Sequence, residues 1–243
     1  MMLHPVLEQL KVLKLHGMLE SLEGQLKQPE IRQLGFEERL SLLISHEVSL
    51  RETRRVAKRL RAAKLKSSAC FEDINFKATR GLDKSLVFSL EGCQWLVEHR
   101  NILISGATGT GKTYLAEAFA HKACLKGFTA LSLRLPRFFS ELLQSKADGT
   151  YIKKLHALSK IDLLCLDDFG IAPLTDENRR DFLEILDDRY KKRSTIITSQ
   201  LEVKHWHAAI GDATLADAIL DRVVHNSYRF GLKGSTLRKE SSE

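Results

Sequence analysis

Proline and glycine are scarce in this chain of 243 residues, which contains 4 prolines and 14 glycines. A long flexible linker is therefore not expected. Cysteine is rare too: the four cysteines lie far apart and none forms a Cys-x-x-Cys pair, which argues against a zinc site. Cys124 and Cys165 stand in apolar runs, and we expect them to be reduced thiols of the core.

Long hydrophobic runs are missing as well. No stretch approaches the roughly 18 uncharged apolar residues that a membrane-spanning helix needs. The beginning of the chain mixes acidic and basic side chains with leucines, which is not typical of a signal peptide. These absences predict a cytoplasmic protein that has no membrane partner.

The chain does contain enough apolar material to bury a core. Hydrophobic residues make up 43% of the sequence and charged residues 28%, which is typical of a folded protein. The length fits one large α/β domain with a smaller appendage. The net charge of +7 indicates nucleic acid or an acidic membrane surface as a partner, or simply a surface rich in lysine, and the position of the charge must decide.

The first part of the chain is expected to be helical. Leucines between Leu7 and Leu22 form an apolar stripe at helical spacing, and Pro29 then interrupts the pattern. A second helix is expected over residues 36–66, and the irregular stretch 69–82 follows it as a joint. We therefore expect a small, all-helical N-terminal domain over residues 1–68 and a larger α/β domain over residues 69–243.

Strand-like and helix-like patterns alternate in the rest of the chain. The alternation predicts an α/β fold with an open, doubly wound sheet of parallel strands. Ligands of such sheets bind at the carboxyl ends of the strands. Helices are expected over residues 85–99, 112–126 and 177–191 and from residue 136, and strands over 101–105, 129–135, 161–167, 194–199 and, more weakly, 226–231.

A glycine-rich segment lies between the first expected strand and the next helix. Its sequence GATGTGKT fits the phosphate-loop pattern G-x-x-x-x-G-K-[ST] at every fixed position. Glycines let successive N–H groups turn inward toward phosphate oxygens, and the following helix adds its positive dipole end. Lys112 can bridge the β- and γ-phosphates of ATP, and the Thr113 hydroxyl can ligate Mg²⁺. The predicted nucleotide contacts are Gly106, Ala107, Thr108, Gly109, Thr110, Gly111, Lys112, Thr113 and Tyr114.

Two carboxylates follow the apolar residues of the third expected strand, in the sequence LLCLDD. Adjacent acids at the end of a buried strand are costly unless they meet a cation or water. A metal ion at the phosphate loop supplies that cation: we expect Asp167 to hold Mg²⁺, and Asp168 to orient or deprotonate the attacking water. The alternative is a polar turn after the strand. Many related ATPases carry glutamate at the second position, and the shorter Asp168 can place the base differently.

Polar residues also end the fourth expected strand. Ser199 or Gln200 could hydrogen-bond the attacking water or the γ-phosphate if this strand lies beside the phosphate loop, although a polar strand exit explains them nearly as well. Arg222 lies off the apolar face of a later helix and could reach the ATP site of a neighbouring subunit. The alternative is a solvated arginine paired with an aspartate of its own helix. Arg238 is a weaker candidate for the same role.

Positive charge is concentrated in residues 51–66, which hold eight cations and one acid. Basic residues recur there at spacings of three or four and form a row along one broad helix face. Such a row favours a polyanion; because no aromatic side chain is interleaved, we expect contact with the backbone of duplex DNA without sequence reading. The alternatives are a solvated face or an acidic protein partner. The predicted DNA-binding residues are Arg51, Arg54, Arg55, Lys58, Arg59, Arg61 and Lys64.

Several segments together resemble one protein family. GATGTGKT, LLCLDDFG, STIITSQ and ADAILDRVVHNSYRFGLKGSTLRK occur in the order found in IstB-type transposition helper ATPases, which are relatives of the DnaC helicase loaders. The leucine-rich LKLHGMLESL and the basic RETRRVAKRLRAAKLK are similar to that family too. The resemblance covers nearly the whole chain.

The resemblance implies an AAA+ core of the initiator and loader clade, preceded by a helical domain that binds DNA or a partner. It implies that Arg222 acts on the ATP of a neighbouring subunit and that Ser199 or Gln200 is a sensor. Members bind duplex DNA largely independently of sequence, assemble on it with ATP as homo-oligomers, deform it, and recruit or activate a cognate IstA-type transposase. The expected function is therefore that of an ATP-dependent DNA-binding helper of transposition.

Two other functions stay open on the sequence. A DnaC-like loader of a replicative helicase would bind that helicase through its N-terminal helices and would prefer single-stranded DNA. A protein-interaction module with a vestigial nucleotide site would not hydrolyse ATP.

Overall fold

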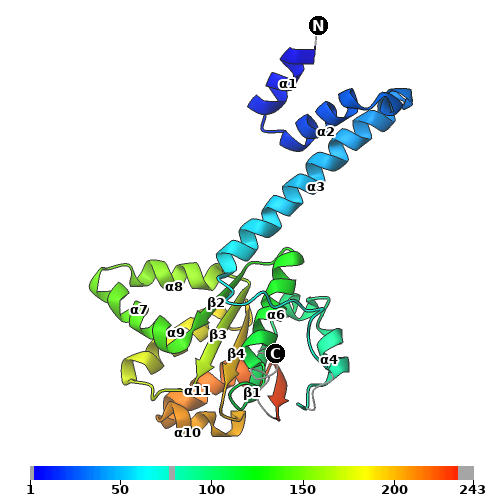
Figure 1. Cartoon of the computed structure of the whole chain (residues 1–243). Helices are drawn as coiled ribbons and strands as arrows, with labels where there is room; N and C mark the ends of the chain where they lie inside the picture. The colour runs from blue at the N-terminus through cyan, green and yellow to red at the C-terminus, as the bar shows by residue number, and fades with distance from the viewer. Residues whose placement is uncertain (1–2, 77–79, 235–243) are drawn as a thin grey trace. The chain divides into compact units, whose positions relative to one another are not determined.

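The computed structural model describes residues 3–76 and 80–234, and the chain divides into two compact units, Met1–Lys58 and Arg59–Glu243. The long helix α3 (Phe36–Ala63) contains the point of division (Figure 1). Among the described residues, no helix is both long enough and apolar enough to cross a membrane.

The first unit consists of helices. It contains α1 (Leu3–Val12), α2 (His16–Lys27), the 3-10 helix η1 (Pro29–Gln33) and most of α3. The leucine stripe is divided between α1 and α2, because Lys14 adopts a left-handed φ of 57° between them. The predicted break at Pro29 is confirmed, with the proline in the first turn of η1.

A buried carboxylate fixes α2 to α3 within the first unit. Glu47 Oε2 accepts hydrogen bonds from Gly17 N at 2.6 Å and from Met18 N at 3.1 Å. These amides belong to the first turn of α2, where backbone donors have no partner inside the helix. A Cβ atom on Gly17 would lie 2.6 Å from Glu47 Cα, so the close approach of the two helices requires glycine at this position.

The second unit is built on a five-stranded sheet. The strand order is β2-β3-β4-β1-β5 and every pairing is parallel, which confirms the predicted doubly wound α/β class. The weakly predicted fifth strand is present at the edge beside β1. The strands are β1 (Asn101–Gly106), β2 (Ala130–Arg134), β3 (Leu163–Phe169), β4 (Ser194–Ser199) and β5 (Ser227–Leu232).

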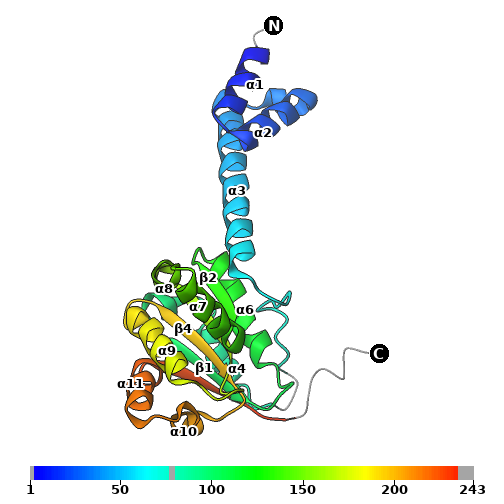
Figure 2. The same ribbon diagram turned by 90° about the vertical axis from the view of Figure 1, so that its left-hand side faces the viewer.

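Apolar residues on alternate positions of the central strands face two separate cores. On β1, Ile102 and Ile104 pack into a core with α6 (Lys112–Leu125), whereas Leu103 between them packs with α7 (Leu135–Ala147) and α9 (Asp176–Arg189). Successive strand side chains point to opposite faces, so a continuous apolar run is what a sheet covered on both sides requires. Figures 1 and 2 show α6 on one side of the strands and α7 and α9 on the other.

The helices of the second unit begin at recognisable caps. Asp83, Thr175 and Asp212 each accept a hydrogen bond from a backbone N–H three residues later, at the starts of α4, α9 and α11. The helices of the second unit are, in chain order, α4 (Lys84–Ser89), α5 (Gln94–Val97), α6 (Lys112–Leu125), α7 (Leu135–Ala147), α8 (Tyr151–Lys160), α9 (Asp176–Arg189), η2 (Val203–His205), α10 (Trp206–Ile210) and α11 (Ala213–Val224).

One helical prediction differs from the structure. The helix expected over residues 85–99 is divided into α4 and α5, because Cys93 has a left-handed φ of 59° that no helix interior allows. The helices α8 and α10 were not predicted. The two cysteines expected in the core are there, with Cys124 fully buried and Cys165 2% exposed.

Candidate functional site: a phosphate loop and two carboxylates

The phosphate loop joins the end of β1 to the start of α6. Gly109 and Gly111 have left-handed φ angles of 87° and 89°, which residues with a side chain rarely adopt. At Gly106 a Cβ atom would lie 2.3 Å from the carbonyl oxygen of Leu232 on the neighbouring strand. The three glycines of the motif are therefore required by the backbone geometry, which turns the loop around the N-terminus of α6.

Side chains of the loop fix its conformation from within. The buried Thr110 hydroxyl donates to Ala107 O at 2.8 Å, and Lys112 Nζ donates to the same oxygen at 2.8 Å. Ala107 and Thr108 are exposed at the tip of the loop. Tyr114 differs from the rest, because its half-buried ring packs against the core on the α6 side, and this burial raises the pKa of its hydroxyl. Its predicted contact with the nucleotide stays untested.

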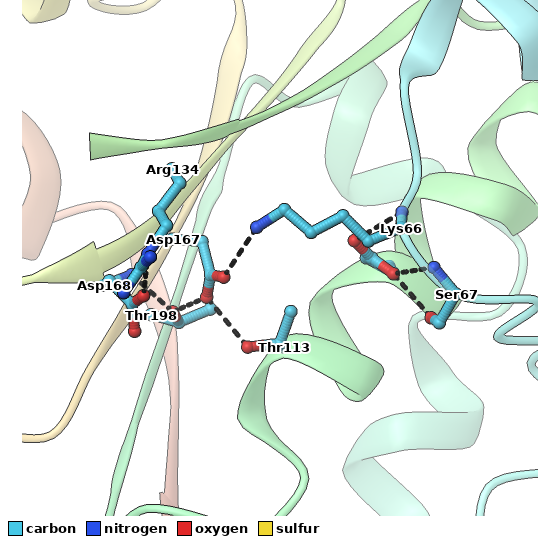
Figure 3. A network of polar contacts seen from close by, with 8 residues as sticks. Lys66, Ser67, Thr113, Arg134, Asp167, Asp168 and Thr198 are labelled. Carbon is cyan, nitrogen blue, oxygen red and sulfur yellow. Dashed lines mark hydrogen bonds and ion pairs between the residues drawn. The ribbon is translucent and has the colours of Figure 1, made fainter. Parts of the chain in front are cut away.

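Asp167 connects three elements at the carboxyl edge of the sheet. Its Oδ1 accepts hydrogen bonds from Thr113 Oγ1 at 2.9 Å and from Thr198 Oγ1 at 2.5 Å. Lys66 Nζ lies 3.4 Å from Oδ2. Figure 3 shows these side chains converging on Asp167 from β4, the first turn of α6 and the segment that follows α3. A hydroxyl and a carboxylate that already touch fit a hard cation such as Mg²⁺, which prefers oxygen ligands.

Asp168 turns away from this cluster. Its φ of 66° is left-handed, and the pairing of β3 with β4 is irregular between Leu166 and Phe169. Asp168 N donates to Thr198 Oγ1 at 3.2 Å, while its carboxylate Oδ2 accepts from Arg134 Nε at 2.6 Å. The two adjacent acids therefore have separate surroundings: one meets the phosphate loop, and the other meets an arginine at the end of β2.

The polar end of β4 has a different layout from the one expected. Ser199 is fully buried; its Oγ donates to Phe169 O at 2.8 Å and accepts from Leu201 N at 3.1 Å, so it ties the strand exits together. Gln200 is exposed. The side chain that contacts Asp167 is Thr198, which we did not single out from the sequence. The predicted sensor role of Ser199 or Gln200 is not tested by these contacts.

Arg222 lies at the amino ends of the strands, whereas the phosphate loop of its own chain lies at their carboxyl ends. Its carbonyl oxygen accepts from Asn101 Nδ2 at 3.2 Å, and Asn101 begins the strand that ends at the loop. Five residues of strand span roughly 16 Å. The guanidinium contacts Asp187 on α9, with Nε donating to Oδ1 at 2.8 Å. Arg238 lies outside the described residues.

The basic residues of α3 and the segment after it have unequal surroundings. In the first unit, Arg51 Nε donates to Glu47 Oε1 at 2.6 Å, and in the second unit Arg59 Nη1 donates to Cys124 O at 3.0 Å. Arg55 pairs with Glu52 at 3.6 Å on the surface. The DNA-binding role of this row stays a prediction. The exposed members of the predicted set are Arg51, Arg54, Arg55, Lys58, Arg61 and Lys64.

A buried arginine beside the phosphate loop was also missed. Arg80 is 4% exposed; its Nη1 donates to Thr110 O at 3.3 Å and its Nη2 to Asn75 O at 2.8 Å. Within the described part of the chain, its Nε has no hydrogen-bond partner. Burial lowers the pKa of this guanidinium. Arg80 stands in the irregular joint before α4, where no periodic pattern marks it as buried.

The fold and the loop together define an AAA+ phosphate-loop protein that binds ATP. The family model described as IstB-like ATP binding protein matches residues 8–243, and the chain belongs to that family. An insertion sequence ATP-binding protein of Sinorhizobium fredii, y4pL, is 45% identical over 98% of this chain and 98% of its own length. The ATP-binding protein of insertion sequence IS21 from Pseudomonas aeruginosa is 31% identical over 97% of this chain and 89% of its own.

Solved structures agree on the fold. A structure of the replication initiator DnaA bound to AMPPCP and single-stranded DNA is 18% identical, with a TM-score of 0.58 over 71% of this chain and 52% of that one. The DnaC helicase loader is 20% identical, with a TM-score of 0.57 over 70% of this chain and 100% of that one. At these identities the similarity establishes the AAA+ architecture.

Proposed function

We propose that this chain is an ATPase whose nucleotide cycle controls its assembly on duplex DNA during transposition. The observation that carries the proposal is the contact of Thr113 Oγ1 with Asp167 Oδ1, 2.9 Å apart beside the phosphate loop. Phosphate-loop proteins hold the Mg²⁺ of bound ATP with a hydroxyl and a carboxylate of this kind.

The residues of the site divide the chemistry among them. The loop N–H groups and Lys112 would bind the phosphates, and Thr113 and Asp167 would hold Mg²⁺, whose charge would offset the negative charge of the phosphates. Asp168 orients the attacking water and accepts its proton, for which its carboxylate must leave Arg134. Ser199 or Gln200 acts as the sensor of the γ-phosphate or the attacking water. Thr198, whose hydroxyl donates to Asp167, is a third polar residue at the same strand end.

ATP turnover requires a second copy of the chain in this proposal. The position of Arg222 supports this, since its carbonyl bonds to the start of β1 and the loop follows the end of that strand. Its guanidinium is bonded to Asp187 of α9 and is 28% exposed, and from there we expect it to reach the ATP of a neighbouring subunit. ATP then favours the assembled homo-oligomer only through its differential affinity for assembled and free subunits.

The basic residues 51–64, in the predicted domain 1–68, supply the duplex contact. Exposed cations such as Arg54, Lys58 and Arg61 support it, because a row of solvated charges can bind backbone phosphates without reading bases. The assembled protein deforms the target and recruits or activates its cognate IstA-type transposase. The buried, reduced cysteines fit an activity in the cytoplasm. The runner-up function is that of a DnaC-like helicase loader, which would prefer single strands.

One binding series tests the proposal. Duplex and single-stranded DNA of equal length are titrated with the protein, each with ATP, ADP or no nucleotide and at several salt concentrations. We expect duplex binding that requires ATP and weakens steeply with salt. A preference for single strands would support the loader function instead, and Lys112→Ala protein that still hydrolyses ATP would exclude the assigned site.

A further inference from the structure

Lys66 has a contact that none of the functions above uses. Its ammonium lies 3.4 Å from Asp167 Oδ2, whereas the hydroxyls of Thr113 and Thr198 both donate to Oδ1. The Asp167 side chain is 8% exposed, and the Lys66 side chain is half exposed. A half-exposed cation from outside the phosphate loop therefore faces Oδ2, the oxygen of Asp167 to which neither threonine donates (Figure 3).

The backbone around Lys66 is held by a second buried acid. Glu117, which is 1% exposed, accepts from Lys66 N at 3.0 Å, from Ser67 N at 2.9 Å and from Ser67 Oγ at 2.5 Å. Glu117 lies one helical turn after Thr113, so both residues are on the same side of α6. One rigid helix thus positions the metal-binding hydroxyl and the lysine that faces the metal-binding carboxylate.

We propose that Lys66 competes with the metal of bound ATP for Asp167. The inference rests on the proposed function, because it assigns a regulator to the same ATP and Mg²⁺ site. A divalent ion held by Asp167 and an ammonium at the same carboxylate repel each other, and the burial of Asp167 limits the screening by solvent on its side. Binding of Mg²⁺ with ATP releases the Lys66 side chain, while Glu117 keeps its backbone in place.

The competition gives the segment after α3 a link to the ATP site. Any anion that draws the Lys66 ammonium away from Asp167 should strengthen the binding of the metal. By linkage, the metal strengthens the binding of that anion by the same factor. A polyanion on the basic residues before Lys66 is such an anion. The chain can therefore bind Mg²⁺ more tightly when this segment is engaged, without any change in the phosphate loop.

The test separates metal binding from nucleotide binding. ATP affinity is measured by calorimetry for the full-length chain, once with excess Mg²⁺ and once with EDTA, and the ratio of the two affinities is the readout. Lys66→Met removes the charge but keeps an apolar stem of similar length, and Lys66→Arg restores a cation. Lys153→Ala is the control, since it removes one positive charge from an exposed position on α8.

Competition predicts that Lys66→Met increases the Mg²⁺-dependent gain in ATP affinity by about threefold to tenfold, the range of a partly exposed ion pair. Lys66→Arg and Lys153→Ala should keep the wild-type ratio. An unchanged ratio in Lys66→Met overturns the inference. A smaller ratio overturns it too, because it would mean that the Lys66 ammonium binds the phosphates of the metal complex. Failure of the wild-type chain to bind ATP would instead refute the proposed function.

Discussion

Arg134 holds Asp168 in an ion pair, with Arg134 Nε donating to Asp168 Oδ2 at 2.6 Å. The two residues come from the ends of β2 and β3, which are adjacent in the sheet. The carboxylate expected to act on the attacking water is therefore engaged by a cation of its own chain. Because the Arg134 side chain is 52% exposed, a bound partner could draw it away at little cost.

This pairing predicts that loss of Arg134 raises ATP turnover in the absence of DNA. Arg134→Ala should increase it by about twofold to fivefold, since the free carboxylate no longer has to break an ion pair. The rate of phosphate release under saturating ATP measures the effect. Arg137→Ala is a matched control, because Arg137 pairs with Glu141 of the same helix and is 83% exposed. A fall in turnover would show that Arg134 assists the reaction directly.

The contacts of Thr198 predict that it matters more to the metal site than either residue after it. Thr198→Val keeps the shape of the side chain but removes the donor to Asp167 Oδ1. We expect a loss of about tenfold in Mg²⁺-dependent ATP affinity, which corresponds to one hydrogen bond to a charged group. Parallel titrations of Ser199→Ala and Gln200→Ala give the comparison. An equal or larger loss in either of these would return the sensor role to the position predicted from the sequence.

The distance of Arg222 from its own loop predicts complementation between subunits. Arg222→Ala should bind ATP normally, because Arg222 does not contact the ATP of its own subunit. It should hydrolyse ATP slowly, because each transition state lacks the arginine that the neighbouring subunit supplies. Mixing it with Lys112→Ala protein should restore part of the activity, measured over a range of ratios. Asp187→Asn is a control that removes the negative charge bonded to Arg222 Nε but keeps the arginine. If no mixture recovers activity, the arginine does not act in trans.

The exposed row on α3 predicts a specific change in salt dependence. Replacing Arg54 and Lys58 by alanine should make the negative slope of log affinity against log salt less steep by about 1.8, at about 0.9 per phosphate contact. Arg51→Ala should change the slope less, because the Arg51 guanidinium is already bonded to Glu47. Fluorescence anisotropy with a labelled duplex at four salt concentrations provides the measurement. A slope that both variants leave unchanged would move the DNA contact away from this helix.

Glu47 predicts a dependence on pH within the first unit. Burial opposes ionisation of Glu47, but the Met18 and Gly17 amides and Arg51 outweigh it and hold its pKa below the ordinary value of 4.5. A lowered pKa in the folded state adds stability above the ordinary pKa, and this stability is lost as the pH falls below it. Glu47→Gln should therefore reduce protection of the Gly17 and Met18 amides at pH 7 and do so less at pH 4. Equal loss of protection at both pH values would contradict the ionic origin.

Local patterns were sufficient to predict the sheet and the phosphate loop. The strand ending at Gly106 is a short apolar run, and the glycines after it can be read without knowing their neighbours in space. The break between α4 and α5 escaped prediction, because nothing in the local pattern marks Cys93 as left-handed.

Contacts between distant segments could not be predicted in the same way. Thr198 and Arg134 reach the acidic pair only because β4 and β2 flank β3, and strand order is not encoded in any one segment. The irregular pairing near Asp168 then sends the two carboxylates to different partners. Lys66 was counted among the cations of the basic segment, but its position is set by Glu117, 51 residues later in the chain.

The most direct test of the account is calorimetric titration of the full-length chain with ATP and Mg²⁺. We expect one nucleotide per chain. With Mg²⁺ present, replacing Asp167 by asparagine should lower the ATP affinity at least about tenfold, and a parallel titration in EDTA shows how much of this loss depends on the metal. Lys112→Ala should lose most of the binding in both conditions. Absence of nucleotide binding by the wild-type chain, or binding that ignores both substitutions, would contradict the central claim that this loop and carboxylate hold ATP and its metal.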